Sequence, residues 1–151
     1  MSVGVGEAAP AFTLPALRGG QVTLADFVGK KNVVLFFYPK DMTPGCTVEA
    51  CTFRDAYEDF VAAGAEVIGI SADSVERHQQ FAQKHSLPME LLTDADGQVR
   101  ARYGVKATLG MLPGRETFII DKKGVVRHVF RSQLRVKKHV EEALGVLKTL
   151  S

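Results

Sequence analysis

Two cysteines, Cys46 and Cys51, carry the strongest chemical signal in this sequence. Cys46 follows Thr43-Pro44-Gly45 and precedes a helical pattern, so we expect it in the first turn of a helix. Unpaired backbone N–H groups and the positive end of the helix dipole stabilise a thiolate at that position. Because the thiolate is the nucleophilic form of cysteine, a reactive thiol is predicted. The alternative, a small buried hydrophobic residue, fits Cys51 equally well but fits Cys46 poorly.

The composition excludes several other kinds of chemistry. The chain has 151 residues, of which 46% are hydrophobic and 24% charged, so we expect one folded domain over residues 1–151 that needs no metal or disulfide to fold. Its 19 basic and 17 acidic residues are interspersed, which argues against a nucleic-acid partner. Two cysteines and four dispersed histidines do not make a zinc site or a disulfide scaffold.

The hydrophobic segments are too short to cross a membrane. The longest apolar run, residues 33–38, has six residues, where about eighteen are needed. The first basic residue is Arg18, and no charged segment followed by an apolar core precedes it, so we expect no secretory signal. We therefore expect a cytoplasmic protein, although a mature organellar chain would look the same. In a reducing compartment a cysteine pair is more often catalytic than structural.

The elements around Cys46 must hold it in place. Residues 32–38 form a continuous apolar and aromatic run closed by Pro39, which predicts a strand buried on both faces near the centre of a sheet. Residues 47–63 have helical spacing and end at Gly64, which suits a helix C-terminus. The loop between them leaves the carboxyl end of the central strand, where open α/β sheets carry their sites.

The rest of the chain alternates between strands and helices. We expect an N-terminal hairpin at residues 12–14 and 21–24, strands at 66–71, 91–93, 117–121 and 125–130, and helices at 74–85, 97–103 and 139–150, with Ser74 as an N-cap. This order describes an α/β three-layer sandwich in which helices flank a central mixed sheet. It resembles the plan of the thioredoxin-like fold.

The segment around Cys46 also resembles the active-site motif of the peroxiredoxins. The pattern Pro39-x-x-x-Thr43-x-x-Cys46 matches that motif, and Thr43-Pro44-Gly45-Cys46-Thr47 with Cys51 five residues on is similar to the Q-type branch, also called bacterioferritin comigratory protein. The likeness covers nearly the whole chain and includes residues 53–55, 69–71, 112–118 and 120–124. The active-site motif shows no departure from the family pattern.

The resemblance implies a thiol peroxidase. Cys46 would attack hydrogen peroxide or an organic hydroperoxide and become a sulfenic acid, and Cys51 would resolve it as an intramolecular disulfide. Thioredoxin or a similar dithiol protein would reduce that disulfide. Neither a metal nor an organic cofactor is implied, and members of this branch are often monomers.

Ionisation of the thiol cannot supply all of the rate. A thiol with the ordinary pKa of about 8.5 is about 3% ionised at pH 7, so complete ionisation gains only about thirtyfold. Other groups must orient the peroxide and stabilise the departing oxygen. By resemblance these are Thr43, the backbone N–H groups near Gly45 and Cys46, and Arg115, while Pro39 would shield the thiolate.

Some of these residues have a second interpretation. A lone arginine such as Arg115 is usually exposed on the surface. Glu49 lies on the same helix face as Cys46, where it would position the active-site arginine by resemblance or be a solvated charge. Thr43 could cap the helix as well as contact peroxide. We expect the histidines on the surface or partly buried, and Asp94-Ala95-Asp96-Gly97 as a turn and helix cap rather than a calcium loop.

Two other functions compete with the peroxidase. A binding protein on a thioredoxin-like scaffold would have inert cysteines. A disulfide reductase of the thioredoxin type is disfavoured, because such enzymes carry Cys-x-x-Cys and the spacing here is Cys-x-x-x-x-Cys.

Residues five apart on an ideal helix have Cα atoms about 8.6 Å apart, whereas disulfides rarely exceed a Cα separation of about 7 Å. If Cys46 and Cys51 share one helix, their disulfide therefore requires its first turns to unwind.

Overall fold

A mixed five-stranded sheet forms the centre of the molecule, in a computed structural model that describes residues 3–105, 114–132 and 135–150. The strand order is β5-β4-β3-β6-β7, with β3, β4 and β5 parallel and with β6 antiparallel to both β3 and β7. The strands of this sheet are β3 (Asn32–Phe37), β4 (Ala65–Ser71), β5 (Glu90–Thr93), β6 (Glu116–Ile120) and β7 (Val126–Arg131). The strand over residues 32–38 is therefore central, as predicted.

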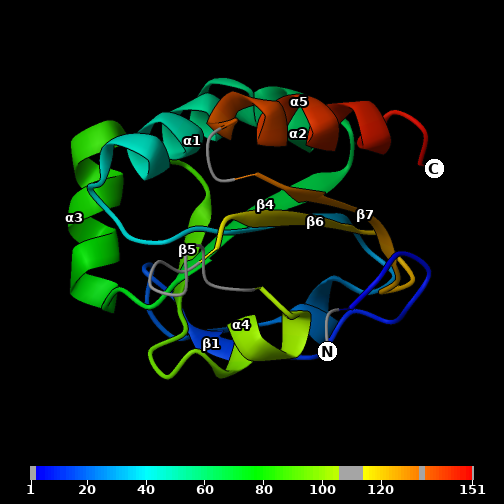
Figure 1. The fold of residues 1–151 in the computed structure, drawn as a ribbon, viewed down its shortest axis with the longest axis horizontal. Coiled ribbons are helices and arrows are strands. Elements are labelled where there is room, and N and C mark those ends of the chain that lie inside the picture. Colours follow the sequence, from blue (N-terminus) through cyan, green and yellow to red (C-terminus); the bar gives the residue numbers. More distant parts are fainter. Residues whose placement is uncertain (1–2, 106–113, 133–134, 151) are drawn as a thin grey trace.

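Helices and a hairpin cover the two faces of the sheet (Figure 1). One face carries α1 (Pro44–Asp55), α2 (Tyr57–Ala62), α3 (Val75–His85) and α5 (Val136–Leu147). The other face carries α4 (Gln98–Tyr103), the short helix η1 (Leu24–Phe27) and the antiparallel hairpin of β1 (Thr13–Pro15) and β2 (Gln21–Thr23). This arrangement confirms the three-layer α/β prediction, including the hairpin.

The central position of β3 explains why its sequence is almost entirely apolar. All six of its residues are buried. Successive side chains of a strand point to opposite faces, so Val34 and Phe36 join the core under α1 while Leu35 and Phe37 join the core over α4. The carboxyl end of β3 is therefore fixed from both sides, and the loop that leads to Cys46 starts there.

The single helix expected over residues 47–63 is two helices. Helix α1 begins three residues earlier, at Pro44, because proline is favoured at the first position of a helix, where its missing N–H costs nothing. The second difference is Ala56, with φ −98° and ψ 5°, which separates α1 from α2. Phe53 and Phe60 still pack on each other across this break, so the hydrophobic spacing alone does not reveal it.

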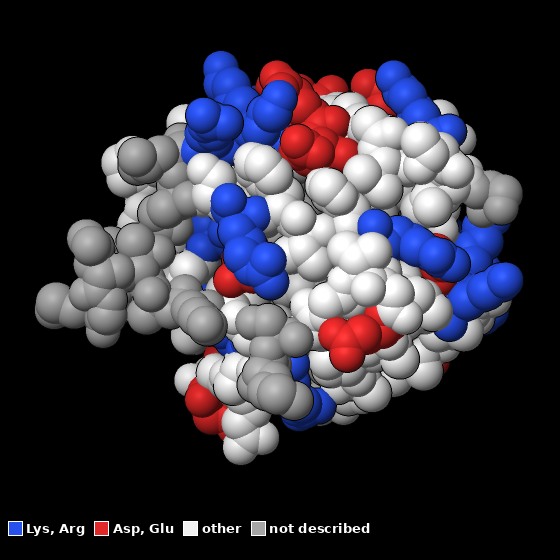
Figure 2. Space-filling model, turned by 45° about the vertical axis from the view of Figure 1, so that its right-hand side comes forward, with Lys and Arg blue, Asp and Glu red and all other residues white. Residues whose placement is uncertain are grey.

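The other elements agree with their expected positions to within a few residues. Ser74 caps α3 by accepting a hydrogen bond from the Arg77 N–H, and Asp94 caps α4 by accepting from Val99 and Arg100. Helix α5 begins and ends three residues before its expected bounds. Across the described residues, every helix is too short or too polar to span a bilayer. On the face drawn in Figure 2, basic and acidic side chains lie beside one another.

Candidate active site

Cys46 lies in the first turn of α1, as predicted. Thr43 occupies the N-cap position, Pro44 and Gly45 begin the helix, and Cys46 is the third helical residue. Its side chain is 2% exposed and packs in the core between β3 and α1. The thiol is thus placed against the helix N-terminus, where backbone N–H groups favour negative charge.

Arg115 lies directly beside the thiol. Its Nη2 donates a hydrogen bond to Cys46 Sγ at 3.4 Å, and the residue is only 6% exposed. The pairing of β3 with β6 brings it there, because Phe37 at the end of β3 pairs with Glu116, the residue after Arg115. The interpretation of Arg115 as an exposed surface residue is therefore wrong.

A close approach at Gly45 makes this contact possible. A Cβ at position 45 would lie 3.1 Å from Arg115 Nη2, closer than most real Cβ contacts. Burial alone would lower the pKa of Arg115, but the neighbouring Glu49 carboxylate and Cys46 thiol raise it above its ordinary value. The guanidinium therefore remains a fixed positive charge against the sulfur.

Glu49 holds Arg115 from the opposite side. Arg115 Nη1 donates to Glu49 Oε1 at 2.7 Å, and the Glu49 side chain is completely buried. The interpretation of Glu49 as a solvated helix charge is therefore wrong. Burial raises the pKa of Glu49 to about 7, and Arg115 lowers it only in part. Among the described residues, Glu49 Oε2 has no hydrogen-bond partner.

His139 of α5 completes this cluster, a position that was not predicted from the sequence. Its Nε2 lies 2.8 Å from the Ser132 carbonyl, an acceptor, so Nε2 carries the proton and Nδ1 accepts from the Thr117 hydroxyl at 2.7 Å. Burial lowers the pKa of His139 to about 4, with the Ser132 bond opposing and Arg115 reinforcing that change. Neutral His139 therefore offers no proton to Glu49 Oε2, 3.6 Å from its Nδ1.

The expectation that the histidines lie on the surface or are partly buried is wrong for both His78 and His139, which are completely buried. Each can be buried because both of its ring nitrogens have hydrogen-bond partners. A signal for His139 was present in the sequence, since it shares a helix face with the apolar residues Ala143 and Leu147, at spacings of four and eight.

Thr43 and Pro39 belong to the loop that joins β3 to α1. Thr43 stands at the N-cap position, but its hydroxyl makes no capping bond and instead donates to the Lys40 carbonyl at 2.8 Å. The expected capping by this side chain is therefore wrong, and the Thr43 oxygen keeps its acceptor lone pairs. Pro39 is half-buried in the same loop. Leu112 and Pro113, part of the motif that precedes Arg115, lie outside the described residues.

Cys51 lies on the same helix as Cys46. Both thiols are free, and α1 runs without interruption from Pro44 to Asp55. Cys51 is half-buried, in contrast to Cys46. Because an unbroken helix separates residues five apart by about 8.6 Å, a disulfide does not fit this conformation.

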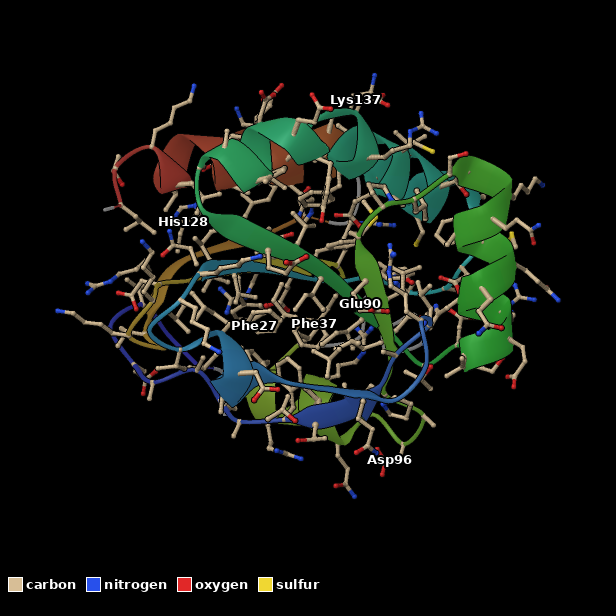
Figure 3. The ribbon with its side chains drawn as sticks, turned by 180° about the vertical axis from the view of Figure 1, so that it is seen from behind. Phe27, Phe37, Glu90, Asp96, His128 and Lys137 are labelled. Carbon is tan, nitrogen blue, oxygen red and sulfur yellow. The ribbon has the colours of Figure 1, made fainter. Side chains whose placement is uncertain are left out.

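Arg100 of α4 joins the two loops that carry the site. Its Nη2 donates to the Tyr38 carbonyl and its Nη1 to the Gly114 carbonyl, both at 2.9 Å. The guanidinium lies 5.7 Å from the centre of the Phe37 ring, which sits between the sheet and α4 (Figure 3). Burial lowers the pKa of Arg100, and nearby acidic groups oppose that shift. Nothing in the local sequence marks Arg100 for this place.

The arrangement is suited to a nucleophilic thiol. The residues that the structure describes include no group of three or more His, Cys, Asp or Glu side chains able to hold a metal ion. A fixed guanidinium and a helix N-terminus instead converge on one sulfur. Such donors stabilise both a thiolate and the negative charge that develops on a leaving oxygen.

Comparisons with known proteins point to one family. The model of the AhpC/TSA family matches residues 5–129. Chloroplastic peroxiredoxin Q of Sedum lineare is 51% identical over 146 residues, covering 96% of this chain and 78% of that protein. The counterpart from Populus jackii is 49% identical, covering 98% and 70%.

Solved structures agree with these sequence relatives. The crystal structure of peroxidoxin BcpB from Mycobacterium tuberculosis has a TM-score of 0.90 and 38% identity, and the match covers 99% of each chain. A structure of the bacterioferritin comigratory protein of Xanthomonas campestris, described for its alkyl peroxide reduction activity, has a TM-score of 0.83 and 33% identity over 91% of this chain and 90% of that one. The shared architecture is the thioredoxin-like fold that the order of elements predicted.

Proposed function

The chain belongs to the AhpC/TSA family and is a peroxiredoxin of the Q type, a thioredoxin-dependent thiol peroxidase. We propose that Cys46 is the thiol that attacks peroxide. The Cys46 thiolate attacks one oxygen of the hydroperoxide. The S–O bond forms as the O–O bond breaks, the departing oxygen takes a proton, and water or an alcohol leaves. Cys46 is then a sulfenic acid. The contact between Arg115 and the buried sulfur, at 3.4 Å, is the observation that supports this role.

Arg115 supplies fixed positive charge throughout the step. Negative charge moves from sulfur to the departing oxygen, so a donor that is already oriented stabilises the transition state without reorganising. Glu49 positions Arg115 through the hydrogen bond to Nη1, which leaves Nη2 directed at the thiol. Glu49 is thus a positioning residue that acts through the arginine.

Thr43 and Pro39 complete the peroxide pocket in this proposal. The Thr43 hydroxyl donates to the Lys40 carbonyl, so its oxygen can accept a hydrogen bond from the peroxide O–H. Pro39 and the first turn of α1 exclude water from the thiolate, and the Gly45 and Cys46 N–H groups add further donors. Orientation by several fixed contacts supplies the rate that ionisation alone does not.

Cys51 resolves the sulfenic acid in the second step. Its thiolate attacks the Cys46 sulfur, the S–S bond forms, and hydroxide leaves and is protonated to water. Because the intact helix keeps the two residues too far apart, the first turns of α1 unwind to allow this bond. Thioredoxin then reduces the exposed disulfide by thiol–disulfide exchange.

We propose that residues 1–151 act as a single domain and a monomer, in the cytoplasm, without nucleic acid or membrane as partners and without a metal or organic cofactor. The interspersed charges support the absence of a nucleic-acid partner. A compartment that maintains reduced dithiol proteins meets the need of the catalytic cycle.

One assay tests the central assignment. Peroxide-dependent NADPH oxidation is measured with thioredoxin and thioredoxin reductase, for the wild type, Cys46→Ser and Cys51→Ser. Cys46→Ser should lose all turnover, because a serine hydroxyl is essentially un-ionised at neutral pH. One equivalent of hydrogen peroxide should also consume both thiols of the reduced wild type within seconds. Appreciable turnover by Cys46→Ser refutes the assignment.

A further inference from the structure

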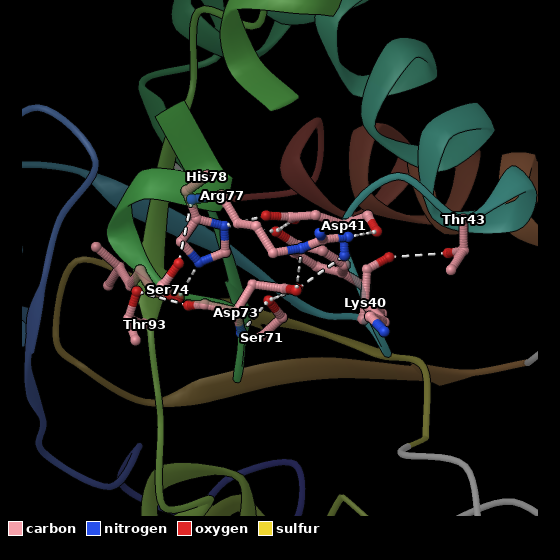
Figure 4. Close-up of polar contacts among 11 residues, drawn as sticks. Lys40, Asp41, Thr43, Ser71, Asp73, Ser74, Arg77, His78 and Thr93 are labelled. Carbon is pink, nitrogen blue, oxygen red and sulfur yellow. Dashed lines mark hydrogen bonds and ion pairs between the residues drawn. The ribbon is translucent and has the colours of Figure 1, made fainter. Parts of the chain in front are cut away.

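A second buried polar cluster lies next to the active-site loop, and its centre is Asp41 (Figure 4). The Asp41 side chain is completely buried, and both of its oxygens are paired: Oδ1 accepts from the Tyr38 hydroxyl at 2.5 Å, and Oδ2 lies 2.6 Å from His78 Nδ1. Its backbone is held as well, because the N–H donates to Asp73 Oδ2 at 2.7 Å and the carbonyl accepts from Arg77 Nη2 at 3.3 Å. We call Tyr38, Asp41, Asp73, Arg77 and His78 the Asp41 latch.

One proton joins the two central residues of the latch. His78 Nε2 lies 3.0 Å from the Leu92 carbonyl, which can only accept, so Nε2 carries a hydrogen. The short contact between His78 Nδ1 and Asp41 Oδ2 holds a second proton between those two atoms. The pair therefore has no net charge, which allows it to be buried without a further counter-ion.

The latch acts on a strained turn. Met42, which follows Asp41, has φ 69°, a left-handed conformation that side chains other than glycine adopt rarely. Such a conformation persists only where the surrounding structure fixes it, and it is concentrated at functional sites. This turn brings Thr43 within 2.8 Å of the Lys40 carbonyl and directs the chain into the first turn of α1.

The geometry of the turn determines the geometry of the thiol. Only Pro44 and Gly45 lie between Thr43, at the end of the turn, and Cys46. Gly45 already packs closely against the Arg115 guanidinium. A small movement of the turn therefore changes the contact of 3.4 Å between Arg115 and the sulfur. Misplacement of reacting groups by about 1 Å can cost about a hundredfold in rate.

The latch is fastened away from the helix that has to unwind. Its hydrogen bonds join the turn to α3 through Arg77 and His78, and to the segment after β4 through Asp73. His78 is bonded in turn to the Leu92 carbonyl of β5. None of these bonds involves a residue of α1. Unwinding of the first turns of α1 therefore breaks none of these bonds.

We propose that Asp41 and His78 are positioning residues of the peroxide site. The hydrogen bond between them holds the turn at Met42, and it remains intact in the disulfide form. This inference rests on the proposed peroxidase function. The latch orients Thr43 and Cys46 for peroxide in the reduced enzyme, and it is the fixed end at which unwinding of α1 stops. Refolding after reduction then starts from a preformed turn.

Two rate measurements on the reduced protein test the positioning role. Stopped-flow oxidation by hydrogen peroxide depends on orientation in the pocket, whereas alkylation by iodoacetamide reports the thiolate without using the peroxide contacts. In His78→Gln we expect peroxide oxidation to fall at least tenfold while alkylation is unchanged or faster. The matched control is His128→Gln, because His128 is a partly exposed histidine that pairs with Glu142 on another part of the surface. It should match the wild type in both rates.

The outcomes separate positioning from a general structural effect. A fall in the peroxide rate of less than tenfold, or an equal fall in both rates, overturns the proposal. If His78→Gln does not fold, Tyr38→Phe is judged by the same criterion, since it removes one bond to Asp41 and keeps the ring stacked on Phe36. If the wild type itself does not react with peroxide, the proposed function fails rather than the latch.

Amide exchange on the wild type tests the second half of the proposal and needs no variant. The disulfide form is prepared with diamide, so the measurement does not depend on peroxidase activity. We expect residues 46–53 to exchange much faster than in the reduced protein, while the Asp41 amide, bonded to Asp73, keeps its protection. Loss of protection at Asp41 in the disulfide form shows that the latch opens and overturns this part.

Discussion

Glu49→Gln should change how the stability of the protein depends on pH, because the buried carboxyl titrates near neutrality. The pKa of Glu49 is raised from 4.5 to about 7, so the folded state binds its proton more tightly than the unfolded state does. The stability that this group contributes is fully present below pH 4.5 and is lost as the pH rises through 7. At about 1.4 kcal/mol for each pKa unit, the loss is roughly 3 kcal/mol.

His139 opposes this effect over most of the same range. Its pKa is lowered from 6.5 to about 4, so its contribution to stability is present above pH 6.5 and is lost as the pH falls through 4. The size is again roughly 3 kcal/mol. Between about pH 4.5 and 6.5 the Glu49 contribution falls while the His139 contribution rises by a similar amount, so the stability of the wild type should be almost insensitive to pH there.

Replacing either residue should reveal the pH dependence of stability that the other one contributes. Glu49→Gln keeps the size of the side chain and an acceptor for Arg115, so only the rising contribution of His139 remains, and stability should increase by roughly 2 kcal/mol from pH 4.5 to 6.5. His139→Gln should show the reverse, a decrease as the pH rises to 7. The measurement is urea unfolding of the reduced protein at several pH values, with the His128→Gln variant as a control. If all four proteins give parallel curves of stability against pH, the assignment of these titrations is wrong.

Three further predictions concern the reaction itself. Arg115→Ala should slow the first peroxide reaction by tenfold or more and Arg115→Lys by less, because lysine keeps the charge but loses the paired contacts to Glu49 and Cys46; an unchanged stopped-flow rate in both would remove the arginine from the mechanism. Gly45→Ala should also slow this step several-fold, with an unfolding midpoint lowered by only a few degrees, since its Cβ would lie 3.1 Å from Arg115 Nη2; the same rate as the wild type would show that the arginine yields freely. Cys51→Ser should leave the first reaction nearly intact but let excess peroxide drive Cys46 to sulfinic acid, detected by intact mass, whereas normal turnover with thioredoxin would show that Cys51 is not the resolving thiol.

The sequence alone determined the features that depend on local chemistry. An unbroken apolar run marked β3 as a buried strand, and the placement of Cys46 after Pro44 and Gly45 marked the first turn of a helix. The motif around Cys46 indicated the family, which the relatives at about half identity bear out. These signals survive without a structure because each is set by residues within about one helical turn or one strand.

Which distant residues complete the site depends on how the strands and helices pack together. Arg115 is 69 positions from Cys46, and the pairing of β3 with β6 brings it to the sulfur. The burial of Glu49 and the enclosure of His139 depend on how α5 packs over α1.

The same holds for the turn that precedes the thiol. In the sequence His78 looks like an ordinary helix residue. Its role becomes visible only in the fold, where α3, β5 and the loop after β3 meet around Asp41. A polar side chain can be buried only where partners from other elements satisfy it, and no local periodicity records where those partners will be.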